Sequence, residues 1–158
     1  MIGFSRNSST RPELNPDGFF NRKNKTMEIT KNIVDRKKES DGVWLDYDAE
    51  TRLCIGSINS RYYKETHQNA FDELKRKSRK VTTEQAEKMQ LEVYAKAILL
   101  DWSGITMKGQ EYKRTNENAL YLLENIPQLR EFVFVAANSH ENFRVEQLEE
   151  AKAQLGEP

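Results

Sequence analysis

The chain has 158 residues, of which 37% are hydrophobic and 32% are charged, and its mean hydropathy is −0.85. That length fits one domain with tails, and the polar composition predicts a modest core with long solvated segments. The formal net charge is zero, which excludes bulk attraction to nucleic acid or to membranes as a basis for assigning function. The charge is uneven, however, with 17 Lys and Arg against 12 Asp and Glu in residues 1–80, and 8 against 13 in residues 81–158.

The single cysteine, Cys54, excludes an intramolecular disulfide bond and is typical of a reducing compartment. Because it falls in an alternating apolar run, we expect a buried, unreactive thiol. The longest apolar runs, residues 97–100 and 132–137, are far shorter than the ~20 residues that a membrane helix needs. We therefore expect a cytoplasmic protein that has no membrane partner.

Residues 1–26 are rich in Asn, Ser, Arg, Lys and Pro and show no period, which predicts a flexible N-terminal arm. Residues 27–158 are expected to form a single domain. Its clearest strand signal lies at residues 43–58, where apolar and polar side chains alternate on both sides of a turn at residues 48–50. An isolated hairpin is only marginally stable in water, so one face of this hairpin is expected to cover other elements.

Several helices are predicted after the hairpin. Residues 59–80 carry apolar side chains at helical spacing and have a basic end. A capping box formed by Thr82 and Gln85 begins the main helix, which is expected to be a continuous buried rod over residues 86–102. Trp102 is expected to pack in the core with its indole N–H on a loop carbonyl.

The remaining helix signals follow a turn at residues 108–109. Thr115 is the expected N-cap of one helix, and Pro127 is expected in the first turn of the next. A thin apolar stripe over residues 145–155 predicts a last helix that packs on one neighbour only. Together these elements predict a mostly α (α+β) fold, in which an N-terminal β-hairpin at residues 43–58 precedes a compact bundle of about four to five helices at residues 59–155.

No set of residues has the spacing of a catalytic or metal site. The acids of residues 46–50 alternate as in a calcium loop, but Thr51 and Ser57 stand where that loop needs Gly and an acid, so a solvated turn is expected. His67 and His140 have no second His or Cys at ligand spacing. Gly-rich phosphate loops and nucleophile elbows do not occur. We therefore expect no enzymatic activity, no catalytic residues, no metal and no cofactor.

Residues 75–80 contain five cations in six positions. Clustered Lys and Arg can neutralise phosphates, so a small nucleic-acid-binding regulator is one interpretation of this run. The run ends a predicted helix, however, where the helix dipole favours cations, and no Gly–aromatic pattern accompanies it. A solvated helix end or an acidic protein partner is therefore the preferred interpretation, and nucleic acid is an unlikely partner.

Three short motifs follow one another along the chain, at residues 53–59 (Leu-Cys-Ile-Gly-Ser-Ile-Asn), 101–105 (Asp-Trp-Ser-Gly-Ile) and 127–130 (Pro-Gln-Leu-Arg). In this order they resemble the tail assembly chaperones of long-tailed bacteriophages, and the resemblance extends over residues 43–150. The Asp-Trp-x-Gly-Ile and Pro-x-Leu-Arg motifs are its most specific part. The chain departs from the family pattern at residues 59–62, which read Asn-Ser-Arg-Tyr where Asn-Pro-x-Tyr is usual.

The resemblance implies a non-enzymatic protein that binds the tape measure protein, keeps it soluble and helps recruit tail tube protein. It also implies a location in the cytoplasm of the infected bacterium and absence from the mature virion. A tape measure protein is a long helical chain with exposed apolar stripes, so its partner is expected to offer an apolar surface for helix-in-groove contacts. The residues expected to form that surface are Phe132, Phe134, Val135, Val145, Leu148 and Leu155.

The four consecutive apolar residues 132–135 cannot all face one core, so at least one is expected to be exposed or covered by a partner. The alternative is a helix that is buried on both sides. Two other functions stay open, a structural minor tail protein retained in the virion and, with less support, the nucleic-acid-binding regulator. The thin stripe at residues 145–155 also leaves self-association open.

Overall fold

The computed structural model describes residues 26–145. The predictions for the N-terminal arm and for most of the last helix, including Leu148 and Leu155, lie outside the described residues. Residues 26–32 belong to a separate unit and contain one 3-10 helix, η3 (Ile29–Lys31), capped by Glu28. All other described elements belong to the unit Ile33–Glu146.

The fold of this unit is mixed α and β, so the predicted mostly α bundle is wrong. The helices are α1 (Arg36–Asp41), α2 (Arg61–Lys77), α3 (Thr83–Ala97), α4 (Asn116–Asn125) and α5 (Pro127–Asn138), followed by the 3-10 helix η4 (His140–Phe143). The strands are β1 (Val43–Asp46), β2 (Arg52–Ile55), β3 (Leu99–Ser103), β4 (Thr106–Met107) and β5 (Gln110–Glu111). A three-stranded antiparallel sheet in the order β1-β2-β3 lies at the centre, and β4 and β5 form a second, two-stranded sheet.

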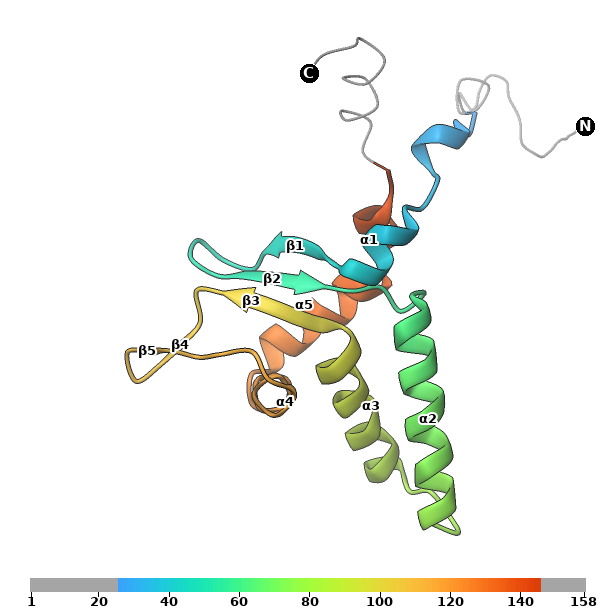
Figure 1. Ribbon diagram of the computed structural model, residues 1–158, viewed down its shortest axis with the longest axis vertical. Coiled ribbons are helices and arrows are strands. Elements are labelled where there is room, and N and C mark those ends of the chain that lie inside the picture. Colours follow the sequence, from blue (N-terminus) through green and yellow to red (C-terminus); the bar gives the residue numbers. More distant parts are fainter. Residues whose placement is uncertain (1–25, 146–158) are drawn as a thin grey trace, which may run out of the picture. The chain divides into compact units, whose positions relative to one another are not determined.

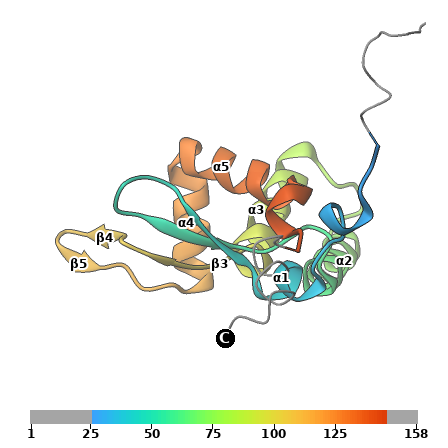
Figure 2. The ribbon, with the colours of Figure 1, turned by 90° about the horizontal axis from the view of Figure 1, so that it is seen from above.

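The helices are divided between the sheet and a projecting pair (Figure 1). Helix α5 lies against one face of the three-stranded sheet, as Figures 1 and 2 both show. Helices α2 and α3 extend side by side away from the sheet. Helix α2 has no buried residue, whereas α3 has five, because α3 is also covered by α4.

The main error of the sequence interpretation concerns residues 98–103. Helix α3 ends at Ala97, and β3 pairs with β2 so that Trp102 lies opposite Leu53 and Leu99 lies opposite Ile55. The extra residue between these pairs is a β-bulge, which places Leu99 and Trp102, three positions apart, on the same buried face. A spacing of three also describes one face of a helix, so the apolar pattern continues that of α3 although the backbone is extended.

Arg114 stabilises the junction between α3 and β3. Its guanidinium donates to the carbonyl of Ala95 at 2.5 Å and to that of Leu99 at 2.9 and 3.1 Å. These carbonyls stand where the helical ladder stops, so they would otherwise lack donors. Burial lowers the pKa of Arg114 from its ordinary value, and the nearby Asp101 carboxylate acts in the opposite direction.

The hairpin prediction is confirmed, because β1 and β2 pair with Leu45 opposite Leu53. In the turn, Oδ1 of Asp48 accepts from the N–H groups of Glu50 and Thr51 at 2.9 and 2.8 Å. These two backbone bonds hold the pKa of Asp48 below its ordinary value. Among the alternating acids, Asp48 therefore stabilises the turn and Asp46 pairs with Arg52.

The predicted helix starts are also confirmed. Thr82 and Gln85 form the reciprocal capping box of α3, and the Thr115 hydroxyl accepts from the N–H of Asn118 at the start of α4. Pro127 begins α5, as expected from its fixed φ and missing N–H. The turn at residues 108–109 joins β4 to β5, two strands too short to be predicted from alternation.

The core lies between the inner face of the sheet and helices α3, α4 and α5. Its buried members include Leu53, Ile55, Tyr94, Ile98, Leu99, Leu123, Leu129 and Val133. Trp102 closes one end of it, and its indole N–H donates to the carbonyl of Tyr112 at 2.6 Å, as predicted. Apolar contact from both sheet and helices explains why the hairpin is stable here although it would be marginal alone.

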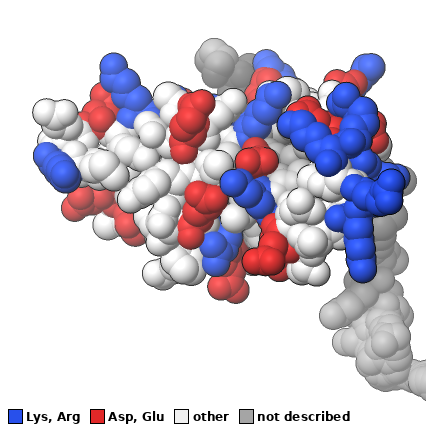
Figure 3. All heavy atoms as spheres, turned by 90° about the horizontal axis from the view of Figure 1, so that it is seen from below, with Lys and Arg blue, Asp and Glu red and all other residues white. Residues whose placement is uncertain are grey.

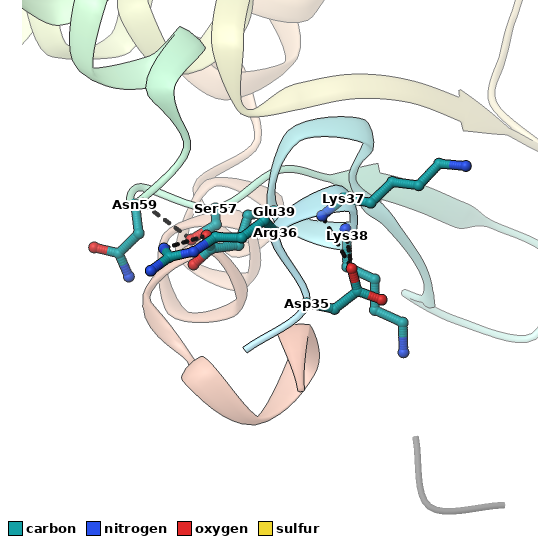
Figure 4. A network of polar contacts seen from close by, with 7 residues as sticks. All are labelled: Asp35, Arg36, Lys37, Lys38, Glu39, Ser57 and Asn59. Atoms are coloured by element: carbon teal, nitrogen blue, oxygen red, sulfur yellow. Dashed lines mark hydrogen bonds and ion pairs between the residues drawn. The ribbon is translucent and has the colours of Figure 1, made fainter. Parts of the chain in front are cut away.

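Helix α1 is tied to the end of β2 by a small polar network (Figure 4). Asp35 caps α1 by accepting from the N–H groups of Lys37 and Lys38. Glu39 is buried, its carboxylate lies 3.2 Å from the Arg36 guanidinium, and its carbonyl accepts from the N–H of Ser57. This network fixes the chain between the sheet and α2.

Candidate protein-binding groove

An open groove of about 340 Å³ lies between β1 and α5. Leu45 and Asp46 of β1 form one wall, and α5 forms the other. The residues that α5 and the following turn contribute are Phe132, Val135, Ala136, Ser139 and Asn142.

The apolar part of the groove comes from alternation in β1 and from one stripe of α5. Leu45 lies on the same face of β1 as the core residues opposite it, but at the sheet edge, so it is only half-buried. Phe132 and Val135 are three positions apart on α5 and therefore share one side of that helix. Val135 is 63% exposed, the largest exposure of any large apolar residue in the described part of Ile33–Glu146. One wall of the groove is therefore uncovered hydrocarbon.

Polar groups close the end of the groove near the C-terminus of α5. The Asn142 amide donates to the carbonyl of Ala136 at 3.0 Å, which also accepts from the N–H of Ser139 at the helix end. On the strand side, the Asp46 carboxylate accepts from Nε of Arg52 at 2.9 Å. The groove thus has an apolar centre and a polar rim, the arrangement found where one protein binds another.

The structure separates the predicted surface residues. Phe132 packs edge-on against Tyr47 with ring centroids 5.3 Å apart, and one side of it lines the groove. Phe134 turns away from the groove and packs on Tyr94 at 4.4 Å. Val135 is exposed, so the expectation that at least one of the four apolar residues is not buried is confirmed.

Val145 does not line the groove. It is half-buried, and its N–H donates to the carbonyl of Ile33 beside an antiparallel bridge between Val34 and Arg144. The stripe predicted from residue 145 onward cannot be placed relative to Val135, because its other members lie outside the described residues.

The sequence interpretation missed the strand side of this groove. Alternation in residues 43–58 predicts one covered face of the hairpin, and nothing in the sequence indicates that β1 is an edge strand beside α5. Ser139 and Asn142 carry no pattern of their own, because they meet the groove only through the turn after α5. Of the residues that line the groove, only Phe132 and Val135 are indicated by the sequence, because they belong to the apolar run at residues 132–135.

Other candidate groups lie apart from the groove. Cys54 is buried in β2, and burial, then the nearby carboxylates of Asp101 and Asp41, raise the pKa of its thiol to about 11. His67 lies on α2 and His140 in η4. Within residues 26–145, no group of three or more His, Cys, Asp or Glu side chains is placed to hold a metal ion. None of the helices in that part of the chain has the length and apolar character needed to cross a membrane.

Basic side chains gather at the C-terminal end of α2, where Figure 3 shows them side by side. Lys75, Arg76 and Lys77 occupy the last turn of α2, and Arg79 and Lys80 follow in the loop to α3. Lys77 is ion-paired with Glu73 at 2.8 Å. This cluster and the groove lie on different elements, so they are two separate candidate surfaces.

Comparison with known proteins gives one family match. The model of a family described as YdaY prophage protein matches residues 58–153 of this chain. The match begins after β2 and includes both motifs that carry the resemblance to tail assembly chaperones most specifically, at residues 101–105 and 127–130. Neither the curated proteins nor the solved structures gave a match.

Proposed function

Because the chain belongs to the YdaY prophage protein family and is therefore phage-derived, we propose that it is a tail assembly chaperone. In this role it binds the tape measure protein, keeps it soluble in the bacterial cytoplasm and helps recruit tail tube protein. It acts by binding, without catalysis and without a cofactor. The phage origin and the resemblance of residues 43–150 to such chaperones support this role.

The observation that carries the proposal is the groove between β1 and α5. Leu45, Phe132 and Val135 offer a contiguous apolar surface, and the polar rim beside it supplies hydrogen-bonding groups. Burying apolar surface releases about 25 cal/mol per Å², so an apolar stripe of a partner gains most by binding here. A tape measure protein carries such stripes along its whole length and would aggregate through them if they stayed exposed.

The surface differs from the one expected from sequence. A continuous helix over residues 86–102 would have offered a long amphipathic face to a partner. Because α3 ends at Ala97 and β3 follows, the protein has no such face there. What remains is a shorter groove between a strand and a helix. Its length suits a few side chains of a partner segment, so each chaperone would cover a short stretch and several copies would be needed for one tape measure chain.

Co-expression with the tape measure protein of the same prophage tests the proposal. We expect the wild-type chain to raise the soluble fraction of that partner and to co-purify with it. Val135→Glu places a charge in the groove without touching the core and should abolish both effects. Met107→Glu is the matched control, because Met107 is also an exposed apolar residue, 43% exposed, but lies in β4. Equal precipitation of the tape measure protein with and without the wild-type chain would contradict the proposal.

A structural minor tail protein that stays in the particle could use the same groove. Mass spectrometry of purified virions separates the two functions, because a chaperone should be missing from them. Finding the chain in stoichiometric amount in the virion would replace the chaperone role with the structural one.

A further inference from the structure

One flank of α2, beside its contact with α3, is a second surface whose outer part has no partner in the described part of the chain. Helix α2 packs on α3 along one side and contributes no fully buried residue. Residues 63, 67, 71 and 75 recur every four positions and form one ridge, which begins at the contact with α3 and turns outward along the helix to the exposed Phe71 and Lys75. Tyr63 anchors the ridge by packing on Tyr94, whereas Phe71, further along, is 38% exposed.

Along the ridge three rings follow one another, and a Lys side chain comes last. His67 lies 5.9 Å from Tyr63 and is stacked on Phe71 at 6.5 Å with an interplanar angle of 11°. Nζ of Lys75 lies over the Phe71 ring, 5.3 Å from its centroid. The ammonium of Lys75 therefore covers one face of Phe71, and the imidazole of His67 lies nearly parallel to the same ring, while Phe71 stays partly exposed.

The charges on α2 are segregated around this ridge. The acids of α2 have partners within the helix, because Glu65 pairs with Arg61, Glu73 with Lys77, and Asp72 accepts from Gln68. Lys64 and Lys75 flank Phe71 on the same side of the helix and form no ion pair with any residue between 26 and 145. The ridge thus presents an apolar edge between free cations, and residues 76–80 add further positive charge beyond it.

We propose that this ridge of α2 binds an acidic amphipathic helix of a partner protein. The partner would place apolar side chains on the edges of Phe71 and His67 and carboxylates beside Lys64 and Lys75. Such a helix matches the ridge in charge and in the spacing of its side chains, since residues three, four and seven apart on a helix share one face. The basic end of α2 would steer the acidic partner toward the ridge and raise its association rate.

The ammonium over Phe71 favours a protein partner over single-stranded nucleic acid. Proteins bind single strands by stacking bases on free aromatic faces, and the Lys75 ammonium already covers one face of Phe71. Double-stranded nucleic acid needs cations alone and would gain nothing from Phe71. The ridge therefore distinguishes the two classes by whether Phe71 contributes to binding.

Binding of a synthetic helix to the full chain tests this proposal by fluorescence anisotropy. The probe has about 20 residues, long enough to be helical, with Leu at helical spacing and Glu on the flanking positions. A second probe carries Lys in place of every Glu, and a duplex DNA of similar length is the third. We expect the acidic helix to bind, its affinity to fall between about 50 and 300 mM salt, and the basic helix not to bind.

Variants locate the binding on the ridge. Lys64→Glu/Lys75→Glu should weaken binding of the acidic helix about tenfold or more, and Phe71→Ala should weaken it about threefold to tenfold. Lys37→Glu/Lys113→Glu makes the same change in net charge at exposed cations on other elements and should leave the affinity within about twofold. All these positions are exposed, so circular dichroism should show unchanged folding.

Several results would overturn the proposal. These are equal binding of the acidic and basic helices, no binding of either, equal losses in the ridge and control variants, or tighter binding of duplex DNA that Phe71→Ala does not affect. Val135→Glu should not change the affinity for the acidic helix. A result that contradicts binding at the ridge can therefore be distinguished from one that contradicts binding in the groove between β1 and α5.

Discussion

Two glycines with the same φ have different roles. Gly104 and Gly109 both have φ of +82°, a conformation that other residues adopt only with strain. A Cβ on Gly104 would overlap the carbonyl oxygen of Glu50, whereas a Cβ on Gly109 would have no atom within 4 Å. Gly104 is thus needed where β3 ends beside the hairpin turn, and the Thr51 hydroxyl donates to its carbonyl at 3.3 Å.

We expect Gly104→Ala to lower the free energy of unfolding by about 3 kcal/mol or more, and Gly109→Ala by about 1 kcal/mol. Both variants place a Cβ at the same φ, so the larger loss expected for Gly104→Ala is attributed to the overlap with Glu50. Urea denaturation followed by circular dichroism measures both values. Equal losses of unfolding free energy would mean that the turn at residues 48–51 moves away from the added Cβ at no energetic cost.

Cys54 makes the stability depend on pH in the alkaline range. Its pKa rises from an ordinary value of 9.0 in an exposed thiol to about 11 in the fold, because burial disfavours the thiolate. Between these values the unfolded chain loses the proton and the folded chain keeps it, so unfolding becomes more favourable as the pH rises. The contribution of the Cys54 thiol to the free energy of unfolding is complete below pH 9 and is lost as the pH rises through about 11.

Comparison with Cys54→Ala isolates this effect. We expect the variant to be less stable at pH 8, because Ala leaves a cavity beside the sheet. The difference in free energy of unfolding between wild type and variant should then decrease from pH 9 to pH 11. Urea denaturation at several pH values measures this difference. A difference that stays constant over this range would contradict a raised thiol pKa.

At the scale of elements, the two edges of the central sheet are protected differently. On β3, the Leu99 carbonyl accepts from Arg114 and the N–H of Trp102 donates to the Asp101 carboxylate. On β1, the N–H of Tyr47 donates to the Thr51 carbonyl, so Leu45, two residues earlier, also directs its backbone toward β2. The N–H groups of Trp44 and Asp46 therefore point away from β2, at the free edge of the sheet.

Proline substitutions test this register. Asp46→Pro removes an N–H that points away from β2, so it should cost less than about 1 kcal/mol beyond Asp46→Ala. Leu45→Pro removes a ladder hydrogen bond and should cost about 3 kcal/mol beyond Leu45→Ala. Thermal unfolding of the four variants gives both differences. The reverse order would mean that the hairpin is shifted by one residue.

Elements with a local signal could be predicted from the sequence. The capping box at Thr82, the N-cap at Thr115 and the proline at the start of α5 each depend on residues within one turn. The strand β3 could not be predicted, because its bulge gives it the spacing of a helix and only pairing with β2 makes it extended. That single element turned an expected helix bundle into a mixed fold.

At the scale of the whole molecule, half of the candidate site was accessible from sequence. Four apolar residues in a row implied that one is exposed, and Val135 is. The other wall comes from β1, about 90 positions earlier in the chain, and no short-range pattern connects it with α5. The hydrogen bonds of Arg114 were missed for the same reason, since they join residues 15 and 19 positions apart.

The ridge on α2 and the groove between β1 and α5 give the molecule two independent surfaces. A chaperone that holds one protein while recruiting another needs two such surfaces. The groove would hold the tape measure protein, and the ridge would be free for an acidic segment of a second protein. This division follows from the separate elements that carry the two surfaces.

Hydrogen exchange of the chain alone and mixed with the tape measure protein, its proposed partner, tests the proposed binding site most directly. We expect the complex to slow exchange of the amides of Trp44 and Asp46 in β1 and of the last two turns of α5, with little change in β4 and β5. Protection that spares β1 and α5 and falls elsewhere on the chain would contradict the groove as the site of binding.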